Sequence, residues 1–150
     1  MNSTKALLQL RDYWFEDFRW KPVGKSENPV EEDILPGVKV GVFQADEGGD
    51  YFVQLQVFLS EDRAQRSGAP YQFRLIVVGQ FYFEEGLSPE VQKHMIYANG
   101  ASILYGIARA SLAEGTAHGR EGKYVLPSLN FIKILEKSGQ LRGAVRPALT

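Results

Sequence analysis

The chain has 150 residues, 44% of them hydrophobic, which is enough to build one core, so residues 1–150 are predicted to form a single domain. Its 17 basic and 18 acidic residues leave a net charge of -1, which argues against a nucleic acid or an anionic membrane as a partner held by bulk charge. The absence of cysteine excludes disulfides, thiol chemistry and cysteine metal sites. No segment approaches ~20 continuous apolar residues and the first ten lack a signal-peptide core, so we expect a cytoplasmic protein without membrane insertion.

The first part of the chain shows the period-2 alternation of β-strands. The aromatic segment at residues 13–20 predicts a first strand, and residues 21–37, with three prolines, predict a crossover that is too long for a hairpin. Three further strands are predicted to form a meander, at residues 38–42, 51–59 and 71–83. Glu47-Gly48-Gly49-Asp50 is the turn between the first two of them, and residues 60–70 are interpreted as a polar loop.

The apolar period then changes to that of helices, which makes the fold class α+β. Ser88-Pro89 predicts a helix start, because serine is a good cap and proline fits the first turn. Apolar residues recur at three- and four-residue spacing from Asn99 to Glu114, and Gly115 is a candidate for the end of this helix. A shorter helix is predicted from about Asn130 to Gly139, followed by a loose tail at residues 139–150.

The order of short motifs in the last third is the most informative feature of the sequence. The motifs are Asn99 with Ile103 and Leu104, then Arg109, then Gly115-Thr116, then the loop 117–124, then Pro127-Ser128-Leu129-Asn130-Phe131. This order resembles the end of SecB, the export chaperone, and the resemblance continues upstream through Gly79-Gln80-Phe81-Tyr82-Phe83 to cover about residues 13–135. It implies a four-stranded antiparallel Greek-key sheet followed by two helices, with the core at about residues 13–137.

The resemblance also implies a function. A SecB-like protein is an ATP-independent holdase that binds unfolded or non-native polypeptides, and it needs no nucleotide, metal or other cofactor. SecB is a homotetramer, a dimer of dimers, in which the matching small-residue helices pack together. The residues expected at this interface are Ile103, Leu104, Ile107, Ser111 and Leu112. The alternative is that this helix packs on the sheet of its own chain.

The aromatic content exceeds what one inward sheet face can hide, so some aromatic side chains must cover a second surface. Exposed apolar and aromatic side chains beside loops bind extended chains with little sequence preference. By resemblance to the SecB grooves, the residues expected in a polypeptide-binding groove are Trp14, Phe18, Trp20, Phe43, Phe52, Phe58, Tyr124, Leu126, Phe131 and Ile134. The alternative for each of them is a place in the core or at a subunit interface.

The partner is less well defined by the resemblance. SecB docks on the SecA motor through acidic positions of its sheet, of which this chain keeps Asp17, whereas the two others fall at Lys21 and Arg74. The tail, with Arg142 and Arg146, is basic. SecA stays a candidate partner, but this charge reversal argues against it. Unfolded preproteins are one candidate class of client, and the antitoxin of a toxin–antitoxin pair is the other.

Enzyme chemistry is not expected. His94 and His118 lie far apart in the sequence and show no metal-ligand spacing with carboxylates. Gly119 to Lys123 superficially suggests a phosphate loop, but Ala117 stands where the first glycine is required and Tyr124 where the hydroxyl ligand is required. Two alternative functions remain, a dedicated protein-binding adaptor and a small-ligand-binding α+β domain with a closed aromatic pocket.

Overall fold

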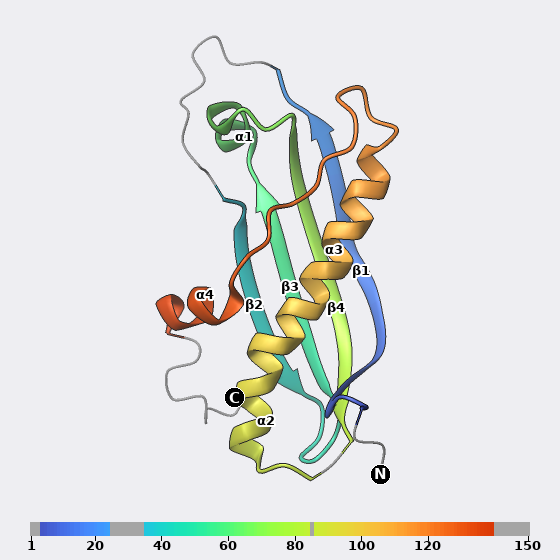
Figure 1. Ribbon diagram of the computed structural model, residues 1–150, viewed down its shortest axis with the longest axis vertical. Coiled ribbons are helices and arrows are strands. Elements are labelled where there is room, and N and C mark those ends of the chain that lie inside the picture. Colours follow the sequence, from blue (N-terminus) through green and yellow to red (C-terminus); the bar gives the residue numbers. More distant parts are fainter. Residues whose placement is uncertain (1–3, 25–34, 85, 140–150) are drawn as a thin grey trace.

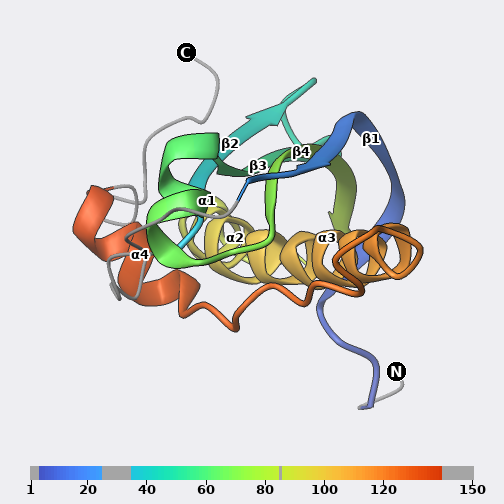
Figure 2. The same ribbon diagram turned by 90° about the horizontal axis from the view of Figure 1, so that it is seen from above.

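The protein is built from two layers, a four-stranded antiparallel sheet and a layer of helices on one side of it (Figures 1 and 2). The computed structural model describes residues 4–24, 35–84 and 86–139. Its strands are β1 (Leu8–Pro22), β2 (Gly37–Gln44), β3 (Tyr51–Leu59) and β4 (Tyr71–Phe83), in the spatial order β1-β4-β3-β2. The meander and the crossover are confirmed, because β1 and β2 lie at opposite edges, although residues 25–34 of their connection lie outside the described residues.

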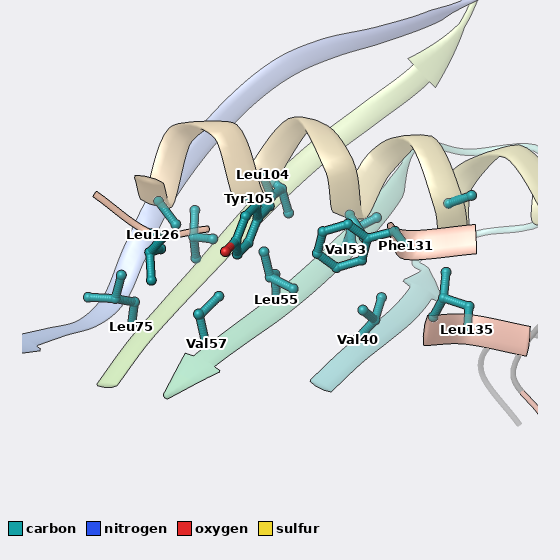
Figure 3. Close-up of a cluster of buried hydrophobic side chains, with 14 of the residues drawn as sticks. Val40, Val53, Leu55, Val57, Leu75, Leu104, Tyr105, Leu126, Phe131 and Leu135 are labelled. Carbon is teal, nitrogen blue, oxygen red and sulfur yellow. The ribbon is translucent and has the colours of Figure 1, made fainter. Parts of the chain in front are cut away.

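Sequence alternation explains the two faces of the sheet. In β3 every odd residue from Tyr51 to Leu59 is buried, and every even residue is half-buried. Val40, Leu55 and Val77 occupy one row across β2, β3 and β4, and all three are buried. Val40 and Leu55 face the helices (Figure 3). We call this side of the sheet the helix face and the opposite side the outer face.

β1 begins five residues earlier than predicted and contains two irregularities. Its 15 residues pair with the 13 residues of β4, because Arg11 and Glu16 have no partner in the register. Each is the extra residue of a β-bulge, which interrupts the alternation of the strand. As a result Trp14, opposite Val78, lies on the outer face, whereas Phe18, opposite Leu75, lies on the helix face.

One long helical run crosses the helix face as α2 (Pro89–Met95), a single π-helical turn η1 (Ile96–Gly100) and α3 (Ala101–Thr116) (Figure 1). The predicted start is confirmed, since the Ser88 side chain accepts a hydrogen bond from the Val91 N–H at 3.3 Å. The predicted end at Gly115 is wrong. The helix continues to Thr116 with Ala117 at its C-cap, and Gly115 lies where the helix passes close to Trp20.

Two short helices complete the fold. α4 (Phe131–Ser138) confirms the prediction, with Asn130 as its N-cap and Gly139, at φ 79°, as its C-cap. α1 (Glu61–Ser67) was not predicted and lies in the segment interpreted as a polar loop. Its only buried residue is Ala64, so it shows almost no apolar period.

The core lies between the sheet and the long helix. Leu104 on α3 approaches β4 at Gly79, where an added Cβ would lie 2.7 Å from Leu104 Cδ2. Any larger residue at position 79 would force the Leu104 side chain or the Phe81 ring to shift, so glycine favours this close approach of the two layers. The other fully buried leucines between the layers are Leu55, Leu75, Leu112, Leu126 and Leu135.

Candidate functional site

The outer face of the sheet is the surface that the helices leave uncovered. α2, η1, α3 and α4 all lie on the helix face, and α1 lies at the end of the sheet where β3 leads into β4 (Figures 1 and 2). A ligand could therefore reach the side chains on the outer face without any movement of the helical layer.

Three aromatic residues form a patch near the β2–β3 turn, which we call the outer aromatic patch and define as Trp14, Phe43 and Phe52. The rings of Phe43 and Phe52 stack at 5.3 Å between centroids, and Trp14 meets Phe52 edge-on at 6.5 Å. Trp14 is 39% exposed and Phe43 is 38% exposed. The three rings come from β1, β2 and β3 of one sheet, so the patch is preorganised for contact with another apolar surface.

A groove of about 760 Å³ lies at the opposite end of the outer face. We call it the basic groove and define it by the outward side chains at its rim, Arg19, Lys21, Phe58, Gln72 and Arg74. Phe18, Trp20, Leu59 and Phe73 also border it, although the alternation of the strands places their side chains toward the helix face. Phe58 thus lies apart from Phe52, with the outward residues Gln54 and Gln56 between them on β3.

Phe18, Trp20 and Tyr124 lie on the helix face around the C-terminal end of α3. An added Cβ at Gly115 would meet Trp20 Nε1 at 3.0 Å, and the Trp20 ring lies 5.3 Å from that of Tyr71. Trp20 and Tyr124 are half-buried, and burial raises the pKa of Tyr124. These rings pack under the loop that follows α3.

Hydrogen bonds hold that loop to the sheet. The Tyr71 hydroxyl donates to the Gly122 carbonyl at 2.8 Å and accepts from the Glu121 N–H at 3.2 Å. The Tyr124 N–H donates to the Thr116 hydroxyl at 2.8 Å. The loop therefore covers part of the helix-face aromatic residues.

Leu126 and Phe131 belong to the core, where they are 0% and 3% exposed (Figure 3). The segment between them is held by the Tyr105 hydroxyl, which donates to the Pro127 carbonyl at 2.5 Å, and burial raises the pKa of Tyr105. Ile134 on α4 is half-buried. The ten residues expected in one groove thus occupy the outer face, the helix face under the loop, the core and α4.

The residues expected at a tetramer interface also divide. Leu104 and Leu112 are fully buried against the sheet of their own chain, as the alternative reading of this helix holds. Ile103 is 37% exposed, and Ile107 and Ser111 are half-buried. An interface through this helix stays a prediction, and it would use the accessible residues Ile103, Ile107 and Ser111.

A second hollow of about 490 Å³ lies between the start of the long helix and the start of α4, and it is bordered by Asn99, Ser102 and Ile132 among others.

Within the described ranges, no three His, Asp or Glu side chains come together as a metal site. None of the described helices is long and apolar enough to cross a membrane. The predictions of no cofactor and no enzyme activity are not tested by these observations.

Comparisons with known proteins identify the fold. No protein-family model matches the chain, and no curated protein matches it in sequence. One similar solved structure is the Mycobacterium tuberculosis Rv1957 SecB-like chaperone in complex with a ChAD peptide from the Rv1956 HigA1 antitoxin. The alignment covers 81% of this chain and 87% of the chaperone chain, at a TM-score of 0.54 and 14% sequence identity. A protein of unknown function from Streptococcus agalactiae aligns with 81% of this chain and 97% of its own at a TM-score of 0.47 and 15% identity. The likeness to the M. tuberculosis chaperone and the order of the elements confirm that this chain has a SecB-like fold.

Proposed function

We propose that this protein is an ATP-independent holdase that binds unfolded or non-native polypeptides on the outer aromatic patch. The observation that carries the proposal is the uncovered outer face with its three neighbouring aromatic rings. The SecB-like fold supports it, because the M. tuberculosis neighbour is a chaperone in complex with a peptide.

The exposure of the rings sets the strength of each contact. Full burial of a large apolar side chain contributes roughly 1.5 to 3 kcal/mol. Since only 39% of Trp14 and 38% of Phe43 remain exposed, each contributes about 1 kcal/mol when a client covers it. A client must therefore touch several such positions at once, which suits an extended chain better than a single residue.

A homotetramer in the cytoplasm would supply those repeated contacts. Joining four patches in one assembly raises the apparent affinity for a long client without any new contact. Ile103, Ile107 and Ser111 are the candidate interface residues that stay accessible on α3. The resemblance to SecB and the likeness to the M. tuberculosis chaperone support two classes of client, unfolded preproteins and an antitoxin. SecA is the weaker candidate for a partner.

Light scattering of a denatured client diluted into buffer tests the proposal. The wild-type protein should suppress aggregation without ATP, and Trp14→Ala/Phe43→Ala should need several-fold more protein for the same effect. Tyr13→Ala is the matched control, because Tyr13 is also an exposed aromatic residue of β1. Its side chain lies on the helix face, since Tyr13 pairs with Gly79 of β4. Equal suppression by both variants would remove the patch as the binding surface.

Failure of the wild-type protein to protect several unrelated clients would refute the holdase proposal. A dedicated adaptor would then be recognised by saturable binding to one folded partner. Charged substitutions at Ile103 and Ile107 test the assembly separately, because they should give smaller folded species in analytical ultracentrifugation, and an unchanged mass would place the interface elsewhere.

A further inference from the structure

We propose that the basic groove binds an extended peptide segment in which acidic side chains alternate with apolar ones. The inference rests on the proposed function in one respect, that the ligand is a polypeptide. It adds a preference for acidic side chains on the ligand, which the outer aromatic patch alone would not select.

The charged residues that border the groove are all cations, Arg19, Lys21 and Arg74. Arg19 and Arg74 lie directly opposite each other on β1 and β4, an arrangement that is unfavourable for like charges. The Asp17 carboxylate contacts both, at 2.8 Å from Arg19 Nη2 and 3.5 Å from Arg74 Nε. One carboxylate between two guanidinium groups leaves a net positive charge, to which Lys21 adds.

The spacing of the cations fits an extended chain. Arg19 and Lys21 are two residues apart on one face of β1, which corresponds to about 6.7 Å. Alternate side chains of an extended peptide have the same spacing. A peptide that lies along β1 therefore places successive acidic side chains against successive cations.

Phe58 supplies the apolar contact. The register places it between Arg74 on β4 and Gly37 on β2. The missing side chain at Gly37 leaves room for the ring, because an added Cβ would overlap Phe58 Cε2. Lys39 lies 5.7 Å from the ring centroid and adds positive charge beside it. An apolar side chain of the ligand would cover Phe58 while its acidic neighbours meet the cations.

The groove is a site for peptides rather than for a small anion. It is open to solvent and its cations are exposed, so that each ion pair contributes only a fraction of 1 kcal/mol. Useful affinity therefore needs several charges and an apolar contact on one ligand.

Fluorescence anisotropy with three labelled peptides tests the proposal. The first alternates Asp with Leu and Phe, the second replaces each Asp by Lys, and the third replaces each Asp by Ser. The acidic peptide should bind at least about tenfold tighter than the basic one, and raising the salt to about 0.5 M should remove most of the difference.

The variant Lys21→Glu/Arg74→Gln should weaken binding of the acidic peptide about tenfold and leave the serine peptide nearly unchanged. Lys93→Glu/Lys137→Gln is the matched control, because it removes the same charge from α2 and α4. Lys21→Glu alone should weaken binding in the same direction, which keeps the test valid should the Arg74 variant fold poorly. Equal affinities for the three peptides, or equal losses in variant and control, would overturn the proposal.

Two further results separate this inference from the proposed function. Suppression of aggregation of a client without acidic clusters should be the same for wild type and the groove variant. A wild-type protein that binds the acidic peptide but protects no client would refute the holdase alone. Smaller species of the groove variant in ultracentrifugation would show that a second copy covers the groove, and would also overturn the proposal.

Discussion

The approach of the long helix to the sheet at Gly79 can be tested by paired substitutions. Gly79→Ala adds a Cβ that lies 2.7 Å from both Leu104 Cδ2 and Phe81 Cε2, so it overpacks the core and should cost about 1 to 3 kcal/mol of the free energy of unfolding. Leu104→Ala empties a fully buried site and should cost about 2 to 5 kcal/mol. In the double variant the new methyl group enters the space that Leu104 leaves, whereas the contact with Phe81 remains.

The double variant should therefore be more stable than the sum of the single costs predicts, by about 0.5 to 2 kcal/mol. The measurement is urea unfolding followed by circular dichroism at one fixed protomer concentration. Gly106→Ala is the control, since an added Cβ there meets nothing within 4 Å, and it should stabilise the helix by about 0.5 to 1 kcal/mol. Costs that add to within about 0.3 kcal/mol would refute the inferred contact.

Three further predictions concern single residues. Tyr105→Phe leaves the Pro127 carbonyl without its donor and should cost about 1 to 3 kcal/mol of the free energy of unfolding. Because burial raises the pKa of Tyr105, the folded protein keeps this proton above pH about 10, where the unfolded chain loses it, and the wild-type protein loses stability as the pH rises. The variant lacks this group, so urea titrations at several alkaline pH values should show a less steep fall of its free energy of unfolding. Gly37→Ala should displace the Phe58 ring, seen as altered aromatic NMR signals, and unchanged signals would contradict the packing described for the groove. Asn130→Ala removes the side chain that caps α4 and should cost about 1 kcal/mol in urea unfolding, whereas no loss would mean that α4 is held by packing alone.

The strands of the meander could be predicted from sequence because each alternates between a buried and a half-exposed face. In β3 this alternation is uninterrupted from Tyr51 to Leu59. The cap at Ser88 and the limits of α4 were also predictable, since local hydrogen bonds and Gly139 decide them.

The helix α1 could not be predicted from apolar period, because only Ala64 is buried. Its signals were local, a serine cap followed by two acidic residues and a closing glycine, Gly68. The prediction that Gly115 ends the helix is wrong for a different reason. Its small size serves the close approach of Trp20, and it has no positive φ of the kind that ends a helix.

The candidate site was only partly predictable, because the bulge at Glu16 changes the phase of β1. Uninterrupted alternation puts Trp14, Phe18 and Trp20 on one face, whereas the bulge sends Trp14 outward and the other two toward α3. Burial of Leu126 likewise depends on the contact of distant elements, which no local pattern reports.

The two extra residues of β1 also bear on how this strand changes in evolution. Since Phe15 pairs with Val77 and Asp17 with Ile76, deletion of Glu16 leaves every other residue of β1 facing as it does now. An edge strand with one free side absorbs a single insertion as a bulge, whereas the same insertion in β3, which pairs on both sides, would exchange core and surface along the rest of the strand. Homologous chains should therefore vary in length by one or two residues within β1 and not within β3, and an alignment made without gaps there would match outward residues of one chain to inward residues of another.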